Sequence, residues 1–107
     1  MKYLDFEVVD IDSVRTPFDE WPPKYQRAEV AGCAMCGKPV GKAPLYILAC
    51  GGGLSTIANK DDDAQLEAKD GGYMGCHPVG SECAKRIRTL VRGAGLDPDK
   101  YLFKVNW

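Results

Sequence analysis

The sequence predicts a small α+β domain, and three observations support this fold class. Four cysteines stand in two groups, at positions 33–36 and 76–83. Two short apolar runs flank the glycines at positions 51–53, which is typical of a β-hairpin. Apolar residues recur at three- and four-residue intervals over Ser81–Gly95, the period of an amphipathic helix. We therefore expect a single domain, residues 1–107, in which a few strands and one main helix surround the cysteines.

The N-terminal part predicts a strand followed by an extended segment. Leu4, Phe6 and Val8 alternate with more polar positions, which is the pattern of an N-terminal strand with one face in the core. Three prolines then lie within Pro17–Pro23. Because proline is excluded from helix interiors and restricts the residue before it, we expect an extended lead-in there.

The middle of the chain predicts a hairpin and a polar connection. Leu45–Ala49 and Leu54–Ile57 are the two apolar runs, and the three glycines between them favour a tight turn. Residues 59–72 are polar, so we expect a solvated loop there, with a short helix at Ala64–Lys69.

The C-terminal third predicts the main helix and an aromatic tail. Ser81 is a favourable N-cap, and Gly93 supplies a stop signal. The apolar stripe of this helix consists of Ala84, Ile87, Leu90 and Val91. Asp97 before Pro98 is typical of the start of a short helical turn, which precedes the tail at 101–107.

The two cysteine groups are the strongest chemical signal. Cys33 and Cys36 form a Cys-x2-Cys-Gly turn, a knuckle that brings two thiolates onto one tetrahedral metal. Cys83 stands in the first turn of the expected helix, where the helix dipole favours a thiolate. Cys76 is the predicted fourth ligand, and His77 is the alternative to it. We expect a closed, structural Zn²⁺ site, because zinc contributes about 10–16 kcal/mol in small fingers and whole domains have stabilities of only about 5–15 kcal/mol.

Other states of the cysteines fit the sequence less well. Five cysteines, an odd number, leave one over in a fully paired disulfide scaffold. A thioredoxin-like pair would need a βαβ pattern, which the downstream hairpin does not supply. Buried free cysteines are the second interpretation of the two groups. Cys50 ends an apolar run, so we expect it to be a small buried hydrophobic residue and not a ligand.

The order of knuckle, hairpin, loop and helix resembles the treble-clef zinc fold, over roughly Cys33–Val91. The motifs Cys33-x2-Cys36-Gly-Lys-Pro and Gly80-x2-Cys83-Ala-Lys-Arg are also similar to those of small phage and bacterial zinc proteins. This resemblance implies a zinc finger with a metal-binding core at about residues 30–93, in a protein that acts as an inhibitor or adaptor.

The sequence departs from the treble-clef pattern at one position. A standard treble clef ends in a second Cys-x2-Cys pair, whereas Gly80 stands three positions before Cys83 here. The fourth ligand therefore stays open between Cys76 and His77.

Charge is distributed unevenly, although the net charge is only −1. Residues 1–20 contain two basic and six acidic residues, and residues 83–107 contain six basic and two acidic residues. Lys85, Arg88 and Arg92 share one face of the expected helix. The overall charge argues against a binder of bulk polyanions, while the asymmetry permits a local basic face.

These features favour a binding module that acts through protein–protein contacts. Trp21 and Trp107 are candidate anchors for a protein partner, together with the basic residues of the helix face. The alternative is a nucleic-acid-binding module that uses the basic helix 82–92. An enzyme is not expected, because the chain has one histidine and a closed site has no position for a zinc-bound water.

The N-terminus and the apolar runs of the chain give an expectation for its location in the cell. The N-terminus has no succession of basic, apolar and small residues, so no signal peptide is visible. No apolar run approaches the length of a membrane span. We therefore expect a cytoplasmic protein with no membrane partner.

Overall fold

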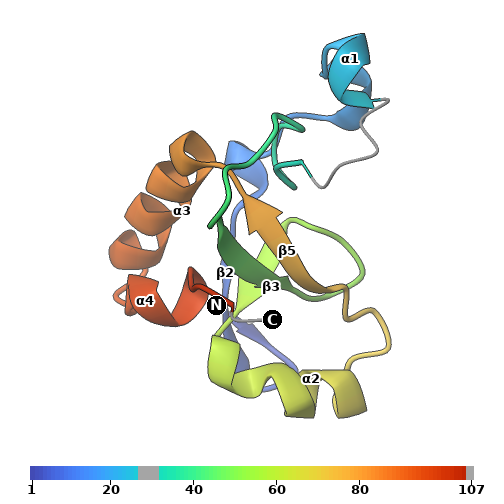
Figure 1. Cartoon of the computed structure of the whole chain (residues 1–107). Coiled ribbons are helices and arrows are strands. Elements are labelled where there is room, and N and C mark those ends of the chain that lie inside the picture. The colour runs from blue at the N-terminus through green and yellow to red at the C-terminus, as the bar shows by residue number, and fades with distance from the viewer. Residues whose placement is uncertain (27–31, 106–107) are drawn as a thin grey trace.

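A computed structural model describes residues 1–26 and 32–105, and within them five strands form one antiparallel sheet. The strands lie in the order β1-β2-β4-β3-β5. Their bounds are Lys2–Tyr3 (β1), Phe6–Asp10 (β2), Leu45–Ala49 (β3), Thr56–Ala58 (β4) and Gly75–Val79 (β5). Helix α3 (Ser81–Gly93) and the short α4 (Pro98–Tyr101) lie beside the sheet, and α2 (Asp63–Lys69) lies at one end of it (Figure 1). The predicted α+β class is confirmed.

The N-terminus forms a hairpin and not the predicted single strand. β1 and β2 pair antiparallel, with Lys2 opposite Glu7. Leu4 and Asp5 connect them with φ values of 49° and 69°, and positive φ at both central residues is typical of a tight two-residue hairpin turn. The predicted strand therefore wrongly included Leu4. Leu4 lies exposed in the turn, and Phe6 is the first buried residue.

The predicted β3–β4 hairpin and the short helix α2 are confirmed, whereas β5 was not expected. Leu48 of β3 lies opposite Ala58 of β4. On its other side β3 pairs with β5 from Leu45, opposite Val79, to Ala49, opposite Gly75. Pro78 argues against a strand in the sequence, because proline is excluded from central strands. β5 is an edge strand, where a missing backbone donor is tolerated.

The segment Pro17–Pro23 is not the extended lead-in that its prolines predict. A short 3₁₀ turn covers Phe18–Glu20, and the single-turn helix α1 covers Pro23–Gln26. Proline fits the first turn of a helix, where its missing N–H has no partner to lose. Two further 3₁₀ turns lie at Asp12–Val14 and Lys60–Asp62.

The start of α3 also differs from prediction. Gly80, with φ −73° and ψ 165°, is the N-cap residue, and no side chain caps the helix. Ser81 is already the first helical residue, and the Ala84 N–H donates to the Gly80 carbonyl at 2.9 Å. The predicted Ser81 cap is therefore wrong by one position. At the other end, Asp97 caps α4 as predicted, accepting from the Asp99 N–H at 3.0 Å.

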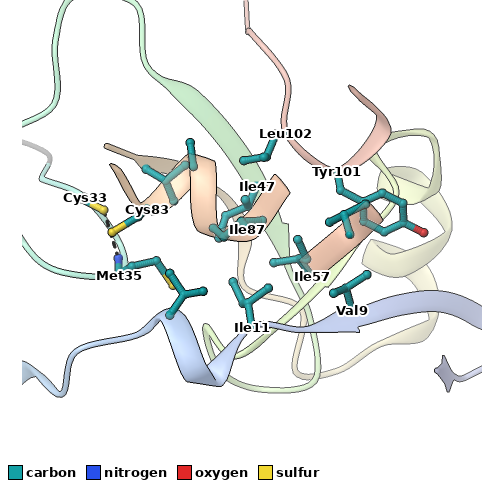
Figure 2. Packing of buried hydrophobic residues seen from close by; sticks show 14 residues of the cluster. Val9, Ile11, Cys33, Met35, Ile47, Ile57, Cys83, Ile87, Tyr101 and Leu102 are labelled. Atoms are coloured by element: carbon teal, nitrogen blue, oxygen red, sulfur yellow. Dashed lines mark hydrogen bonds between the residues drawn. The ribbon is translucent and has the colours of Figure 1, made fainter. Parts of the chain in front are cut away.

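Two groups of buried side chains occupy opposite faces of the sheet. Neighbouring residues of a strand point to opposite faces, so Val9 and Val8 belong to different groups. The larger group joins the sheet to α3, with Ile47 and Ile87 fully buried between them (Figure 2). The smaller group packs the sheet on α2 and consists of Phe6, Val8, Cys50, Ala58 and Leu66. This arrangement fixes the first turn of α3 at one end of the sheet.

No helix within the described ranges combines the length and the apolar character needed to cross a bilayer. Two expectations concern residues outside those ranges. The predicted anchor Trp107 and the first two residues of the predicted core 30–93 are not described.

Candidate metal centre

Three of the predicted ligands lie together where the knuckle meets the first turn of α3. The sulfur atoms of Cys33, Cys36 and Cys83 all lie within 4.8 Å of one another. A tetrahedral zinc with Zn–S bonds of about 2.3 Å needs sulfur–sulfur distances of roughly 3.8 Å, so small side-chain adjustments bring the three onto one ion. Figure 2 shows Cys33 beside Cys83 at the end of the core. We refer to these three residues as the cysteine centre.

The knuckle, residues 32–39, is a tight turn closed by backbone hydrogen bonds. The Cys33 N–H donates to the Lys38 carbonyl, and the Gly37 N–H donates to the Cys33 carbonyl, both at 2.8 Å. Gly37 has a φ of 78°, which L-residues rarely adopt. The Met35 N–H points at the Cys33 sulfur at 3.4 Å. The turn therefore presents both cysteine side chains and a backbone donor to the same point.

The electrostatics of the cysteine centre suit a cation. Burial tends to raise the pKa of Cys33, but hydrogen bonds from the backbone of Gly80, Met35 and Cys36 outweigh it and hold that pKa below its usual value. Burial and the neighbouring Cys33 raise the pKa of Cys83 to about 12. Three thiolates so close together therefore need a positive ion in place of their protons. The three cysteines can bind a metal ion, and thiolate donors are compatible with zinc.

Cys76, the predicted fourth ligand, does not join the centre. It lies in β5 opposite Leu48, four residues before Gly80, which corresponds to about 13 Å of extended chain. Ile47, the residue before Leu48, belongs to the group that packs on α3, so Leu48 and Cys76 face the α2 side of the sheet. Burial and then the charge of Asp63 raise the pKa of Cys76. The prediction placed Cys76 on the same metal as Cys83, seven positions later, whereas β5 carries Cys76 away from the other cysteines.

His77, the alternative ligand, lies near the centre but outside the group of three. Its neighbour in β3 is Ile47. Its Nε2 atom lies 2.8 Å from the Met74 carbonyl oxygen. Within the described parts of the chain, the metal-ligating side chains that converge are those of the three cysteines. Cys50 is buried outside the centre, as predicted, and burial raises its pKa to about 11.

Trp21 is tied to the knuckle and is not a free anchor. A Cβ atom on Gly37 would lie 2.4 Å from the Trp21 ring, so the ring packs directly on this glycine. The indole N–H donates to the Thr16 carbonyl at 2.8 Å, and the Thr16 N–H donates to the Met35 carbonyl at 2.7 Å. Phe18 is 53% exposed, and its ring centroid lies 4.9 Å from that of Trp21.

The basic face of α3 is partly neutralised. Lys85 forms an ion pair with Glu82 at 3.5 Å. Arg88 forms one with Asp99 at 3.4 Å. Arg92 lies exposed in the last turn of the helix.

Two grooves border these features. The aromatic groove, of about 250 Å³, is lined among others by Phe18, Trp21, Tyr25, Leu54, Pro78 and Cys33. A larger groove of about 420 Å³ lies between the segment after the knuckle and α3, with Lys85 and Arg88 among its residues. We favour the aromatic groove as the candidate binding surface, because Cys33 of the cysteine centre lines it and its aromatic side chains come from one segment.

Comparison with protein-family models, with curated proteins and with solved structures finds no match for this chain. The assignment of the centre therefore depends on the geometry of the three cysteines. One contributor to that geometry, the Gly80 backbone, was noted in the sequence only as a missing ligand. No side chain of Gly80 could have indicated this role, since Gly80 acts through its backbone N–H.

Proposed function

We propose that the chain is a non-catalytic, zinc-stabilised binding module of the treble-clef type, which acts through contacts with a protein partner. The treble-clef assignment is supported by the order of parts: a knuckle, the β3–β4 hairpin, and α3 with Cys83 in its first turn. In this proposal Cys33, Cys36 and Cys83 hold zinc, which stabilises the fold. The likeness of its motifs to small phage proteins suggests a role as inhibitor or adaptor.

The aromatic groove is the observation that carries the protein-partner proposal. Phe18 and Tyr25 present partly exposed rings on a segment that Trp21 and Thr16 attach to the knuckle. Aromatic residues are enriched at protein interfaces and dominate their binding energy. Side chains held in place before binding lose less entropy when a partner docks. A fixed aromatic surface is therefore suited to recognise a protein.

Binding of nucleic acid by α3 is the second candidate and has weaker support. Lys85 and Arg88 already face carboxylates of Glu82 and Asp99. Each such pair offsets positive charge that phosphates would otherwise meet. The acidic N-terminal twenty residues add repulsion at longer range.

Within residues 1–26 and 32–105, the one group of metal-ligating side chains is the cysteine centre, so no second cluster supports a catalytic role. The single histidine, His77, contacts the Met74 carbonyl. Three thiolates around one Zn²⁺ give a net charge of −1, which makes a bound water a weaker acid than it is at a site with three neutral histidines.

Paired surface variants test the proposal. Tagged wild-type protein is used for pull-down from the native host with nuclease-treated extract, and for gel shifts with single- and double-stranded DNA and RNA at low salt. We expect a partner that survives nuclease treatment, is lost with Phe18→Ala/Tyr25→Ala and is retained by Lys85→Ala/Arg88→Ala. Micromolar nucleic-acid binding that Arg88→Glu abolishes would reverse the ranking of the two functions.

A further inference from the structure

We infer that the metal held by Cys33, Cys36 and Cys83 offers its fourth coordination position to an exogenous thiolate, and that Gly80 leaves this position without a ligand from this chain. This inference depends on the proposed zinc site. It replaces the closed four-ligand site that the sequence predicts with a site that is completed from outside the chain.

Gly80 lies where a fourth protein ligand would begin. It stands three positions before Cys83, the place of the first cysteine in a second Cys-x2-Cys pair. A Cβ atom built on Gly80 lies 3.9 Å from the Cys33 sulfur and 3.8 Å from the Cys33 Cβ. That separation is an ordinary van der Waals contact, so a side chain at position 80 begins next to a ligand of the proposed metal. A donor side chain at position 80 would therefore start beside the metal, and glycine supplies none.

The nearest other donors are directed elsewhere. Cys76 lies on the opposite side of the sheet, near Asp63. His77 holds its Nε2 atom 2.8 Å from the Met74 carbonyl oxygen. Within residues 1–26 and 32–105, the cluster of metal-ligating side chains ends at the three cysteines.

One side of the centre can be reached from solvent. Cys33 and Cys83 are only 1% and 5% exposed, but Cys36 is partly exposed. Cys33 also contributes to the wall of the aromatic groove. Gly80 lines the larger groove, so a ligand that approaches the open position beside Gly80 would come from that groove.

The three thiolates favour a soft fourth ligand on the metal. Thiolates prefer soft metal ions, and a metal that is already bound by thiolates accepts a further thiolate readily. In this step a thiol releases its proton to solvent, forms one metal–sulfur bond and displaces a weakly held water. No oxidant or reductant is needed. The shared chemistry is a thiolate, supplied either by a cysteine of a protein partner or by a small free thiol.

Cobalt substitution tests this inference, because Co²⁺ absorbs light according to its ligands. Co²⁺-loaded wild-type protein is titrated with 2-mercaptoethanol and with a short peptide that contains one cysteine. We expect the sulfur-to-cobalt charge-transfer absorption to rise by about one third, as three Co–S bonds become four. An affinity for the peptide at least tenfold above that for 2-mercaptoethanol assigns the position to a partner's cysteine, whereas equal affinities assign it to free thiols.

Two variants at position 80 make the test specific. Gly80→Cys should show the four-sulfur spectrum without added thiol and should not respond to titration. Gly80→Ala should respond as wild type does, because the backbone φ of −73° suits alanine and the added Cβ makes ordinary contacts. A wild-type spectrum that ignores added thiol would overturn the inference and indicate a fourth ligand from this chain. Failure to bind Co²⁺ at all would instead contradict the proposed zinc site.

Discussion

The two ends of the sheet are held together by different means. At one end the cysteine centre joins the knuckle to α3 and could bind a metal ion. At the other end Asp70, after α2, is only 5% exposed. It accepts hydrogen bonds from the Tyr3 hydroxyl at 2.8 Å and from the Gly51 and Gly72 N–H groups at 2.9 Å. We call these four residues the Asp70 network, which is complete without any ligand.

In our proposal this small domain depends on a metal at one end only. Burial tends to raise the pKa of Asp70, but its hydrogen bonds with Gly51, Tyr3 and Gly72 outweigh it and hold that pKa below the ordinary value. The carboxylate is therefore stable in its charged form where it lies. Cys83 of the cysteine centre lacks that internal balance, since burial and the neighbouring Cys33 raise its pKa to about 12. The fold there should therefore follow metal occupancy.

Loss of a metal ligand should have the largest effect. Cys36→Ser or Cys83→Ser should unfold the domain or remove its cooperative melting, because the binding free energy of zinc is comparable to the whole stability of a small domain. Thermal melts followed by circular dichroism measure this. Cys50→Ser is the matched control and should lower the free energy of unfolding by about 1–3 kcal/mol. Equal damage from all three variants would mean that the centre is not the one described.

Loss of the buried carboxylate should have an intermediate effect. Asp70→Ala leaves three donors at the other end of the sheet without their acceptor, and we expect a loss of about 1–3 kcal/mol in the free energy of unfolding. Urea unfolding of the zinc-loaded protein measures it, with the exposed Asp19→Ala as control. Zinc content should stay the same in both variants. Loss of zinc from Asp70→Ala would show that the two ends are coupled.

Removing the glycine under Trp21 should weaken the cysteine end without touching a ligand. Gly37→Ala places a Cβ 2.4 Å from the Trp21 ring at a φ of 78°. We expect a loss of about 1–3 kcal/mol and a red shift of tryptophan emission, measured in a Trp107→Phe background so that Trp21 alone reports. Gly80→Ala is the control and should change neither. An unshifted spectrum for Gly37→Ala would contradict the packing of Trp21 on the knuckle.

Lowering the pH should weaken the Asp70 network by protonating the Asp70 carboxylate. A carboxylate whose pKa is lowered in the folded state stabilises the fold above its unfolded pKa of about 3.9. That contribution is lost as pH falls through the lower, folded pKa. The stability gap between wild type and Asp70→Asn should therefore be constant from pH 7 down to about pH 5 and shrink below about pH 4. A gap that does not change with pH would show that the charge of Asp70 contributes nothing.

The two ends also differ in how far the sequence predicts them. Cys33, Cys36 and Cys83 could be identified because metal ligands need fixed residue types at short spacing. Cys76 was assigned wrongly because nothing in its spacing shows that β5 extends the chain there. Pro78 hid that strand, and the edge position that permits it is a property of the whole sheet.

No pattern in the sequence predicts that Asp70 is buried. It stands in a polar stretch after Lys69, and its partners Tyr3 and Gly51 are distant in the chain. The same reasoning explains Trp21, which composition marks as an exposed anchor but which packs on Gly37. Local pattern predicts the helix and the hairpin, while contacts between distant segments decide which polar residue is buried and which aromatic ring packs against a neighbouring turn.

The zinc content of protein purified without added metal tests the central claim most directly. Elemental analysis should find one zinc per chain in wild type and in Cys76→Ser, and almost none in Cys83→Ser. Less than about half an equivalent in wild type, with all thiols of the folded protein reacting freely, would contradict a metal centre formed by Cys33, Cys36 and Cys83.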